Sequence, residues 1–495
     1  QTYITSSFFD ALSRPIRKLT PDNSQTIYRY NEANLLDAID LDFRGSGALQ
    51  PIVRNIEYNA HGMRTKIRCQ NGVTTTYEYD AKTFRLRRLK STRSSDSKLL
   101  QDLNYYFDPV GNITDIFDDA QDNVYFDNAV IKPHGSYTYD LLYRLKKATG
   151  REQIANASPP TGNSPDHVFI PGVNTQSADA LQVYSREYDY DKLGNILQVR
   201  HKAQNNSQGW TRYYQYESLS PLDSSPEQWS NKRNFLSQTS YTDAPGGPFA
   251  FYSYDAHGNM TSMPHLLSMN WDFMDQFKNV DLGGGGHEYY TYTLAGGKDF
   301  GVRRRKVTEK AGGKICDRIY IGDFELYRER MAGGVQLVRE SLHVQDDNGR
   351  ILLIDHQTLD SGQVSSNTNY RYQLSNHLGS ATVELDELAQ LISYEEHYSY
   401  GGSSFRSGRS TKEVKEKRYR YTGKERDNNT GLDYYGGRYY DSIVLKWISP
   451  DPKGYIDGFN LYLFSKGNPV SRLDKNGFNS EIVINKKNKE FFNSI

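Results

Sequence analysis

The sequence predicts an all-β protein built from repeated β-hairpins. A phrase recurs with drift along the chain, and its clearest copies are YDYDKLGNILQV from Tyr188 and YSYDAHGNMTSM from Tyr252. The 495 residues also contain 39 Tyr beside 21 Phe and 4 Trp, and tyrosine favours strands while keeping a polar tip. Hydrophobic residues make up only 36% of the chain, but an aromatic content of 13% argues against disorder. We therefore expect an ordered, β-rich protein with much wet surface and little dry core.

The repeat has the frame aromatic-x-aromatic-Asp-x-x-Gly-Asn-apolar, and we number its copies by the Asp or Asn. This marker residue stands at positions 10, 31, 59, 80, 108, 140, 191 and 255. The first four intervals are 21, 28, 21 and 28 residues, and the later ones stretch to 32, 51 and 64, which predicts inserted loops. An ordinary β-sandwich with coincidental Tyr-Asp pairs is the alternative, and eight spaced copies disfavour it.

Each copy has the residues of a β-hairpin. Aromatic residues two positions apart fall on one face of a strand. The Asp folds back onto the backbone to start a turn, and Gly-Asn supplies the positive φ values of a tight turn. A single hairpin is marginal in water, so we expect the copies to stack into one continuous sheet.

Composition excludes several classes of protein. The chain has 60 basic and 60 acidic residues, and zero net charge argues against a general nucleic-acid or anionic-membrane binder. Two distant cysteines, Cys69 and Cys316, exclude a disulfide framework and a cysteine-based zinc site. The sequence has no run of 18 apolar residues, so we expect no membrane span. We also expect no cofactor or metal. The chain starts at Gln1 without a signal peptide, so we expect it to be part of a longer protein.

Several short motifs have simple structural interpretations. We expect DDNG at 346–349 to form a hairpin turn rather than a calcium loop, and GGGG at 283–286 to be a flexible turn rather than a phosphate loop. The basic run RRRK at 303–306 predicts a solvated strand edge, where charge deters edge-to-edge pairing. His377 has no obvious catalytic or metal partners in the sequence, so we expect it to be structural.

The repeats resemble the YD repeats of Rhs proteins, of the B and C components of Tc toxin complexes and, more distantly, of teneurins. The segment 269–286 is similar to the one that precedes the last repeats in SpvB- and Tc-type members, and 371–401 resembles the family's NHLGS strand pair. The segment from Arg420 to Gly477 is very similar to the Rhs-repeat-associated core. This resemblance implies hairpins that wind into a hollow spiral shell with a C-terminal core plug. The expected parts are the YD-repeat shell at 1–300, its continuation at 301–415, the core at 416–478 and the start of a variable segment at 479–495.

In the family this core is an intramolecular aspartic protease that cuts just after itself. The family phrase YGARYYDP corresponds here to YGGRYYDS, which contains Arg438. The phrase SPDP.G corresponds to SPDPKG, with Asp451, and NPV…DP.G corresponds to NPVSRLDKNG, with Asp474. The resemblance therefore implies that Asp451, Asp474 and Arg438 are catalytic.

The resemblance also implies a cut just after Gly477, between Phe478 and Asn479. Ser442 and Lys475 stand where the family commonly has proline, and Phe478 stands where leucine or methionine is usual. The departures at 475 and 478 lie beside the expected cut, so they bear on cleavage more than on fold.

The chemistry of a carboxylate pair supports this interpretation independently of the resemblance. One ionised carboxylate activates water while a protonated one serves the carbonyl, and two close carboxylates cannot both ionise. A nearby guanidinium biases the pair or stabilises the developing oxyanion. The alternative is that Asp451 and Asp474 only form turns, since Asp-Pro and Asp-x-x-Gly are common turn formers.

The function that we expect is a Rhs/Tc-toxin-type shell that encapsulates its own C-terminal effector and releases it by one act of self-cleavage. The alternatives are a teneurin-like adhesion or recognition scaffold and a carbohydrate-binding β-protein, both without proteolysis. We expect an upstream segment or a B-component-like partner to complete the shell. The expected location is secreted or associated with the cell surface.

Overall fold

The computed structural model describes residues 2–126, 129–154, 181–203, 209–216, 234–241, 249–293 and 301–482. The chain is almost entirely β-structure, as the sequence predicts, and consecutive strands pair antiparallel through most of its length. Of the expected parts, most of the variable segment, at residues 483–495, lies outside the described residues. The division into shell, continuation and core stays a prediction.

Seventeen strands form the first sheet. They are β1 (Ser6–Phe9), β2 (Pro15–Leu19), β3 (Gln25–Tyr30), β4 (Leu36–Asp42), β5 (Leu49–Tyr58), β6 (Arg64–Cys69), β7 (Val73–Tyr79), β8 (Leu86–Arg93), β9 (Leu99–Phe107), β10 (Ile113–Asp118), β13 (His134–Tyr139), β14 (Leu145–Gln153), β15 (Leu181–Tyr190), β16 (Ile196–Ala203), β17 (Gly209–Gln215), β18 (Gln238–Ser240) and β19 (Phe249–Phe251). A 3-10 turn, η1 (Phe43–Gly45), follows β4. Two small hairpins, β11 (Val124–Phe126) with β12 (Ala129–Ile131) and β20 (Ser253–Tyr254) with β21 (Met260–Ser262), stand apart from it.

Twelve strands form the second sheet, and its middle strands are the longest of the chain. They are β22 (Ser268–Trp271), β23 (Phe277–Asp281), β24 (Gly286–Tyr292), β25 (Arg303–Lys310), β26 (Ile315–Ile321), β27 (Phe324–Met331), β28 (Gly334–Asp346), β29 (Gly349–Asp360), β30 (Gln363–Ser375), β31 (Ala381–Leu385), β32 (Leu391–His397) and β33 (Ser403–Gly408). One short helix, α1 (Thr411–Glu416), follows.

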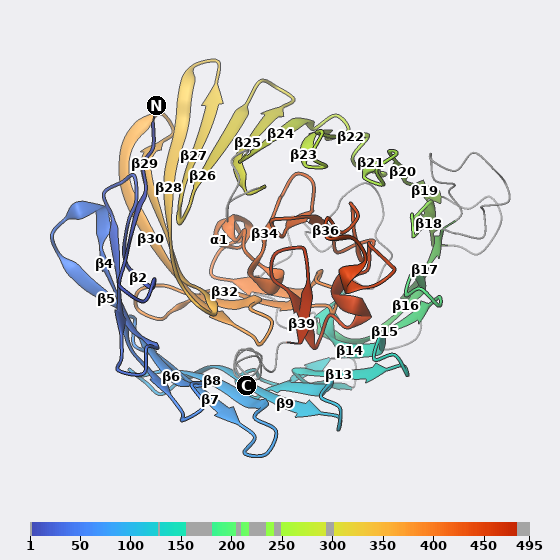
Figure 1. Ribbon diagram of the computed structural model, residues 1–495, viewed down its shortest axis with the longest axis horizontal. Helices are drawn as coiled ribbons and strands as arrows, with labels where there is room; N and C mark the ends of the chain where they lie inside the picture. Colours follow the sequence, from blue (N-terminus) through green and yellow to red (C-terminus); the bar gives the residue numbers. More distant parts are fainter. Residues whose placement is uncertain are drawn as a thin grey trace.

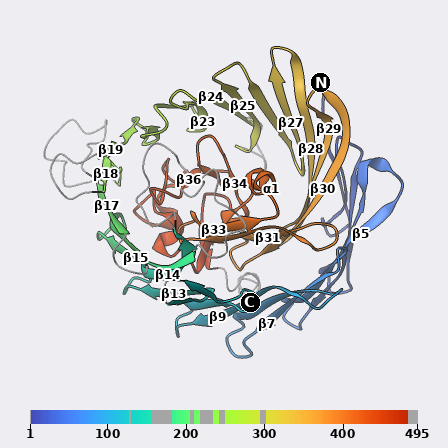
Figure 2. The same cartoon turned by 180° about the vertical axis from the view of Figure 1, so that it is seen from behind.

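The C-terminal core consists of short elements. They are η4 (Tyr421–Gly423), β34 (Glu425–Arg426), β35 (Asp433–Tyr434), β36 (Tyr439–Asp441), β37 (Lys446–Trp447), η5 (Gly454–Asp457), η6 (Phe464–Gly467), β38 (Arg472–Asp474) and β39 (Ser480–Ile482). Figures 1 and 2 show that most strands of the two sheets form a ring around this core, while β31, β32 and β33 run across the interior beside it. We call the ring of strands the wall. One buried cluster joins wall residues such as Leu145 and Tyr188 to residues of the C-terminal core such as Tyr440 and Trp447.

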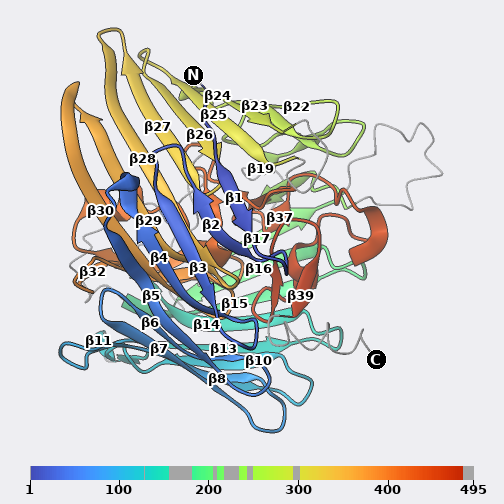
Figure 3. The same cartoon turned by 60° about the vertical axis from the view of Figure 1, so that its left-hand side comes forward.

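The beginning of the first sheet lies beside the long strands of the second sheet (Figure 3). The Nζ of Lys18, on β2, is 2.6 Å from Oδ2 of Asp323, and Arg64 Nη1, on β6, is 2.7 Å from Asp346 Oδ2 at the end of β28. A second buried cluster contains side chains from both regions. In the part of the chain that the structure describes, no helix has the length and apolar character needed to cross a membrane.

The Asp or Asn marker starts the turn in all eight copies, which confirms the predicted hairpin. In each copy its Oδ1 accepts N–H bonds from two backbone amides two to four residues further on. Three further turns that the sequence did not reveal use Asp272, Asn376 and Asp386 in the same way. The marker therefore closes the hairpin by replacing backbone hydrogen bonds that a tight turn cannot make.

In five of the eight copies the tyrosine before the marker joins its hairpin to the preceding one. Its hydroxyl donates to the backbone carbonyl that lies five residues after the previous marker, as in Tyr58 to Leu36 at 2.7 Å and Tyr190 to Leu145 at 2.8 Å. The same bond recurs from Tyr30 to Pro15, Tyr79 to Arg64 and Tyr139 to Ile113. Tyr292, which Thr293 follows in place of a marker, makes the equivalent bond to Phe277. The Tyr-Asp dipeptide thus combines a turn former with a bond that ties neighbouring repeats in register.

The Gly-Asn copies have a second role, because they contact the core. Asn468 donates to Asn112 at 2.9 Å, Asn460 donates to Asn195 at 2.8 Å, and the Tyr462 hydroxyl donates to the Gly258 carbonyl at 2.7 Å. The glycines of these copies have positive φ, but non-glycine residues adopt positive φ in other copies, at Ser13, Asn34, Phe84 and Tyr143. Turn geometry alone therefore does not require Gly-Asn, and the contact with the core gives a further reason for it.

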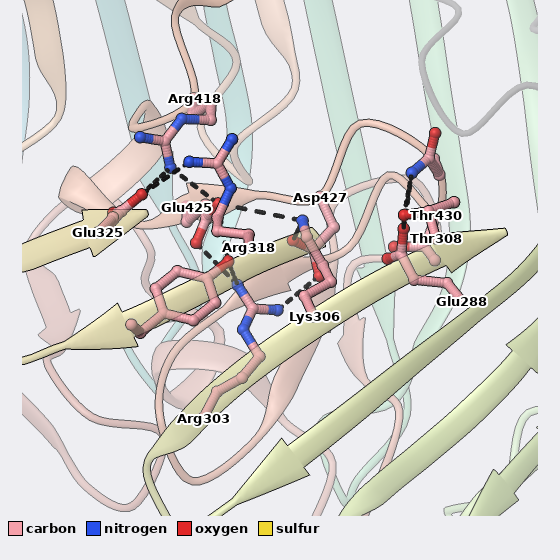
Figure 4. Close-up of polar contacts among 12 residues, drawn as sticks. Glu288, Arg303, Lys306, Thr308, Arg318, Glu325, Arg418, Glu425, Asp427 and Thr430 are labelled. Atoms are coloured by element: carbon pink, nitrogen blue, oxygen red, sulfur yellow. Dashed lines mark hydrogen bonds and ion pairs between the residues drawn. The ribbon is translucent and has the colours of Figure 1, made fainter. Parts of the chain in front are cut away.

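The prediction for residues 303–306 was wrong. Strand β25 pairs with β24 and β26, so it is not a sheet edge, and Arg303 is 1% exposed. Arg303 Nη1 lies 2.7 Å from Asp427 Oδ2 and its Nη2 lies 2.7 Å from Glu425 Oε2, while Lys306 also pairs with Asp427 (Figure 4). Arg303 and Lys306 thus meet two acidic side chains of the core, whereas Arg305 is half exposed and pairs with Asp317 of β26. The sequence of the strand alone carries no sign of the two core acids.

This buried network extends along the interface between wall and core. Arg418 Nη1 lies 2.9 Å from Glu325 and 3.0 Å from Glu425, and Arg318 lies 2.8 Å from Glu325 (Figure 4). Burial alone would raise the pKa of Glu425, but the charges of Arg303, Lys306 and Arg418 bring it down to about 2.

The other short motifs fold as expected. Asp346 accepts the N–H groups of Asn348 and Gly349 in the hairpin turn between β28 and β29. Residues 283–285 form the turn before β24, and Gly286 is the first residue of that strand. His377 Nε2 lies 2.8 Å from the Val470 carbonyl of the core, and burial lowers the pKa of His377 to about 4. His377 thus joins the NHLGS turn to the core, as a structural histidine does.

Candidate active site

Three segments of the core bring the predicted catalytic residues together. Arg438 directly precedes β36, Asp451 follows β37, and Asp474 is the last residue of β38. All three side chains are buried, with residue exposures of 3%, 6% and 1%. The core folds these segments over an aromatic cluster, and the guanidinium carbon of Arg438 lies 4.2 Å from the centre of the Trp447 ring.

The guanidinium of Arg438 is the centre of the site. Its Nη2 lies 2.9 Å from Asp451 Oδ2 and 3.5 Å from Asp474 Oδ2, so one nitrogen faces both carboxyl groups. Its Nε donates to the Gly477 carbonyl at 2.5 Å, and its Nη1 donates to the Leu461 carbonyl at 3.0 Å. Arg438 therefore connects the two aspartates to the backbone that immediately precedes the predicted cut.

The chain before the predicted cut is held at three consecutive carbonyls. Lys424 Nζ donates to the carbonyl of Lys475, the Gly437 amide donates to that of Asn476 at 2.9 Å, and Arg438 Nε donates to that of Gly477. The Oδ1 of Asp474 accepts the Gly477 amide at 2.7 Å, which closes the turn. This arrangement fixes residues 475–477 and presents the Phe478 peptide next.

The chain after the predicted cut continues as β39, which pairs with β38 so that Ser480 lies opposite Asp474. Asn479 therefore lies between two fixed points, the Gly477 carbonyl and the β38–β39 pairing. A pocket of about 10 Å³ lies beside them and is lined by residues that include Arg438, Asp451, Asp457 and Asp474. That volume is about what one water molecule needs.

Burial dominates the electrostatics of the site. It raises the pKa of Asp451 and of Asp474, and the Arg438 charge opposes the rise in both. Burial also lowers the pKa of Arg438, although the two aspartates oppose that shift. Carboxyl groups with raised pKa values keep their protons to higher pH than free aspartate does, and general acid–base work by two carboxyls requires one of them to be protonated. Among the described residues, no group of three or more His, Cys, Asp and Glu side chains forms a possible metal site.

No family model matches the chain. Two toxin subunits of Yersinia entomophaga, YenC1 and YenC2, are each 31% identical to it, over 455 and 486 residues. The aligned regions cover 90% and 96% of this chain and 44% and 48% of those subunits. The crystal structure of TcdB2-TccC3 without its hypervariable C-terminal region is 30% identical, with a TM-score of 0.78, over 96% of this chain and 21% of that one. The chain belongs to the Rhs/Tc-toxin-type family.

This Rhs/Tc-toxin-type chain spans less than half the length of the curated relatives that it matches. The comparisons support a Tc-toxin shell-type protein, as the sequence predicts. The catalytic roles of Asp451, Asp474 and Arg438 and the cut near Gly477, Phe478 and Asn479 stay predictions, although the structure places all six residues in one region.

The structure accounts for the departures from the Rhs family phrases. Ser442 Oγ accepts a bond from Arg426 Nη2 at 2.9 Å, which proline has no hydroxyl to accept. Lys475 contributes its backbone carbonyl, which proline also has, and its side chain is exposed. The Phe478 ring lies against Gly437, and Lys453 Nζ lies 5.5 Å from the ring centre.

Two residues of this Rhs/Tc-type site escaped the sequence analysis. Lys424 is far from Lys475 in sequence, and burial lowers the pKa of Lys424 to about 8 while Asp474 opposes the shift. Nothing in the sequence linked it to the cut. Gly437 did carry a signal, because it stands where the family phrase YGARYYDP has alanine.

Proposed function

We propose that this Tc-toxin shell-type protein encapsulates a C-terminal polypeptide and frees it by cutting its own chain between Phe478 and Asn479. The observation that carries the proposal is the convergence of Asp451 and Asp474 on one nitrogen of Arg438, next to a backbone segment held at three carbonyls. Two buried carboxyl groups with raised pKa values beside an immobilised peptide are suited to hydrolysis of that peptide.

In the proposed reaction the ionised carboxyl of the pair takes a proton from a water molecule. The water oxygen attacks the carbonyl carbon of Phe478, and the protonated carboxyl donates its proton to the carbonyl oxygen. The tetrahedral intermediate then collapses: the carboxyl that took the water proton gives it to the Asn479 nitrogen, the C–N bond breaks, and one hydroxyl of the intermediate returns its proton to the other carboxylate as the C=O bond forms again. The Asn479 nitrogen leaves as an amine. Arg438 contributes charge that stabilises the carboxylate and fixes the adjacent Gly477 carbonyl.

Encapsulation is supported by the position of the core inside the ring of strands (Figure 1). The predicted cut lies in this core, so a downstream segment starts from inside the wall. The related TcdB2-TccC3 has a hypervariable C-terminal region, which fits a variable cargo after a shared shell. We also propose that the native protein is secreted or associated with the cell surface, as a toxin subunit requires.

We expect the full-length protein to be cut once, after Phe478, and the downstream fragment to stay with the shell. Intact-mass measurement gives the position of the cut, and size-exclusion chromatography shows whether the fragment co-elutes. Added protease should degrade the fragment only after the shell is denatured. A chain that stays whole at mildly acidic and neutral pH removes the protease and leaves a scaffold, and a fragment that added protease digests at once removes encapsulation.

The exposed N-terminal strand supports a further proposal about a shell partner. Strand β1 pairs with β2, and Phe8 and Phe9 are 40% and 58% exposed. An exposed apolar strand invites pairing with another chain segment. We propose that upstream sequence or a B-component-like partner covers strand β1. The name of the solved relative, TcdB2-TccC3, joins two such parts.

Hydrogen exchange tests whether a partner covers strand β1. We expect the amides of residues 6–9 to exchange at least about tenfold faster in the present 495-residue chain than in a complex with a B-type subunit, because pairing protects strand amides. The amides of interior strand β15 serve as the control and should not change. Equal protection of residues 6–9 in both samples would contradict the proposed contact.

A further inference from the structure

We propose that Gly437 determines which side chain the self-cleavage site accepts before the cut. The missing Cβ leaves the space in which the Phe478 ring lies, so that residue 437 selects residue 478 by size. This inference rests on the proposed self-cleavage and names the part of the site that recognises its substrate.

The contact is too close for any larger residue at 437. A Cβ placed on Gly437 would lie 2.5 Å from Cζ of Phe478 and 2.6 and 2.9 Å from two other ring atoms. Side-chain atoms do not approach one another that closely, so the ring or the backbone has to move.

The backbone on both sides of this contact is held by hydrogen bonds. The Gly437 amide donates to the Asn476 carbonyl at 2.9 Å, and the next residue, Arg438, holds the Gly477 carbonyl. On the other side, the Phe478 amide donates to Asn476 Oδ1 at 3.3 Å. A Cβ at residue 437 therefore either turns the Phe478 ring out of its place against Gly437 or shifts the peptide that is to be cut relative to the aspartates.

Backbone conformation does not explain the glycine. The neighbouring Gly436 and the facing Gly477 have φ of 98° and 79°, values that side chains disfavour, but Gly437 is not among the residues with positive φ. Alanine at 437 would thus meet no backbone strain. Its only penalty would be the overlap with Phe478.

The test is a double-mutant cycle in the full-length protein, with Gly437→Ala, Phe478→Leu and the double variant. We expect Gly437→Ala alone to slow self-cleavage at least about tenfold, since one misplaced methyl group in a fitted pocket has an effect of this size. In the Phe478→Leu chain, the same substitution should change the rate less than about threefold. Gly333→Ala is the matched control, because a Cβ there meets nothing closer than 3.9 Å, and it should leave the rate unchanged.

A second cycle measures the contact without cleavage. In an Asp474→Asn background, hydrogen exchange of residues 478–482 should speed up with Gly437→Ala when residue 478 is Phe, and not with Phe478→Leu. Coupling in this cycle supports the fit even if the wild-type chain proves not to cut itself, in which case only the proposed protease fails. Equal effects of Gly437→Ala with and without Phe478→Leu in both cycles would overturn the inference.

Discussion

Asp474→Asn should abolish self-cleavage while the protein still folds. We expect a loss of at least about a thousandfold, because removing one member of a cooperating catalytic set removes most of its effect. The amide keeps the volume of the carboxyl, and its Oδ1 can still accept the Gly477 and Asn476 amides, so the turn survives. Asp451→Asn should have the same effect, since Oδ1 at that position also accepts a backbone amide, from Lys453.

Intact mass after a time course at 25 °C measures the remaining rate, and thermal unfolding checks the fold. The matched control is Asp457→Asn. This carboxyl lines the same pocket, but its Oδ1 pairs with Lys466 at 3.0 Å and its Oδ2 accepts the Ser480 amide at 2.9 Å, a bond that the amide oxygen of Asn can still accept. The Asp457→Asn chain should still be cut after Phe478. An Asp474→Asn chain that cuts at the wild-type rate would end the assignment of a carboxyl pair.

The rate of cutting should depend on pH in a bell shape. Cleavage needs one ionised and one protonated carboxyl, so it should fall at low pH when both are protonated and fall at higher pH when both are ionised. Burial raises the pKa of both Asp451 and Asp474, so the alkaline limb should lie above the ordinary aspartate pKa of 3.8. A rate that rises steadily with pH would indicate a different base.

Arg303→Met should strongly destabilise the attachment of the core to the wall. The substitution leaves Glu425 and Asp427 buried with one fewer cation between them, and breaking a buried ion pair in this way costs about 3–5 kcal/mol. Denaturant unfolding, followed by the fluorescence of buried Trp447 in the core, measures the loss. The matched control is Arg87→Met, because Arg87 is 69% exposed and lies 3.8 Å from an exposed Glu78, and its effect should stay below about 1 kcal/mol.

The same network predicts an acid limb of stability. The pKa of Glu425 is about 2 in the folded protein and 4.5 ordinarily, so its ionised form favours folding. This contribution is complete above about pH 5.5 and is lost as the pH falls toward about 2. If Arg303→Met lowers the free energy of unfolding no more than the Arg87→Met control does, water reaches the network and its charges are not buried in solution.

The sequence alone determined the repeating unit. The Asp or Asn marker acts on amides within four residues of itself, so its spacing predicts the hairpin without any knowledge of the rest of the chain. The same local logic predicted the turn at residues 346–349. The resemblance of the core phrases then identified Arg438, Asp451 and Asp474, which lie in separate segments and which no local pattern connects.

The tertiary structure alone decided what those local units face. A basic run such as residues 303–306 fits both a solvated strand edge and a buried interface. Only the contacts with Glu425 and Asp427, more than a hundred residues later in the chain, show that this run lies at an interface. The tyrosine hydroxyls find carbonyls of the preceding repeat only when the hairpins stack. The fit of Phe478 on Gly437 and the hold of Lys424 on the Lys475 carbonyl likewise depend on how the core folds back on itself. Turns follow from the sequence because their hydrogen bonds are local, whereas burial, ion pairing and the fit of the predicted cleavage site follow from contacts between segments that the chain order does not bring together.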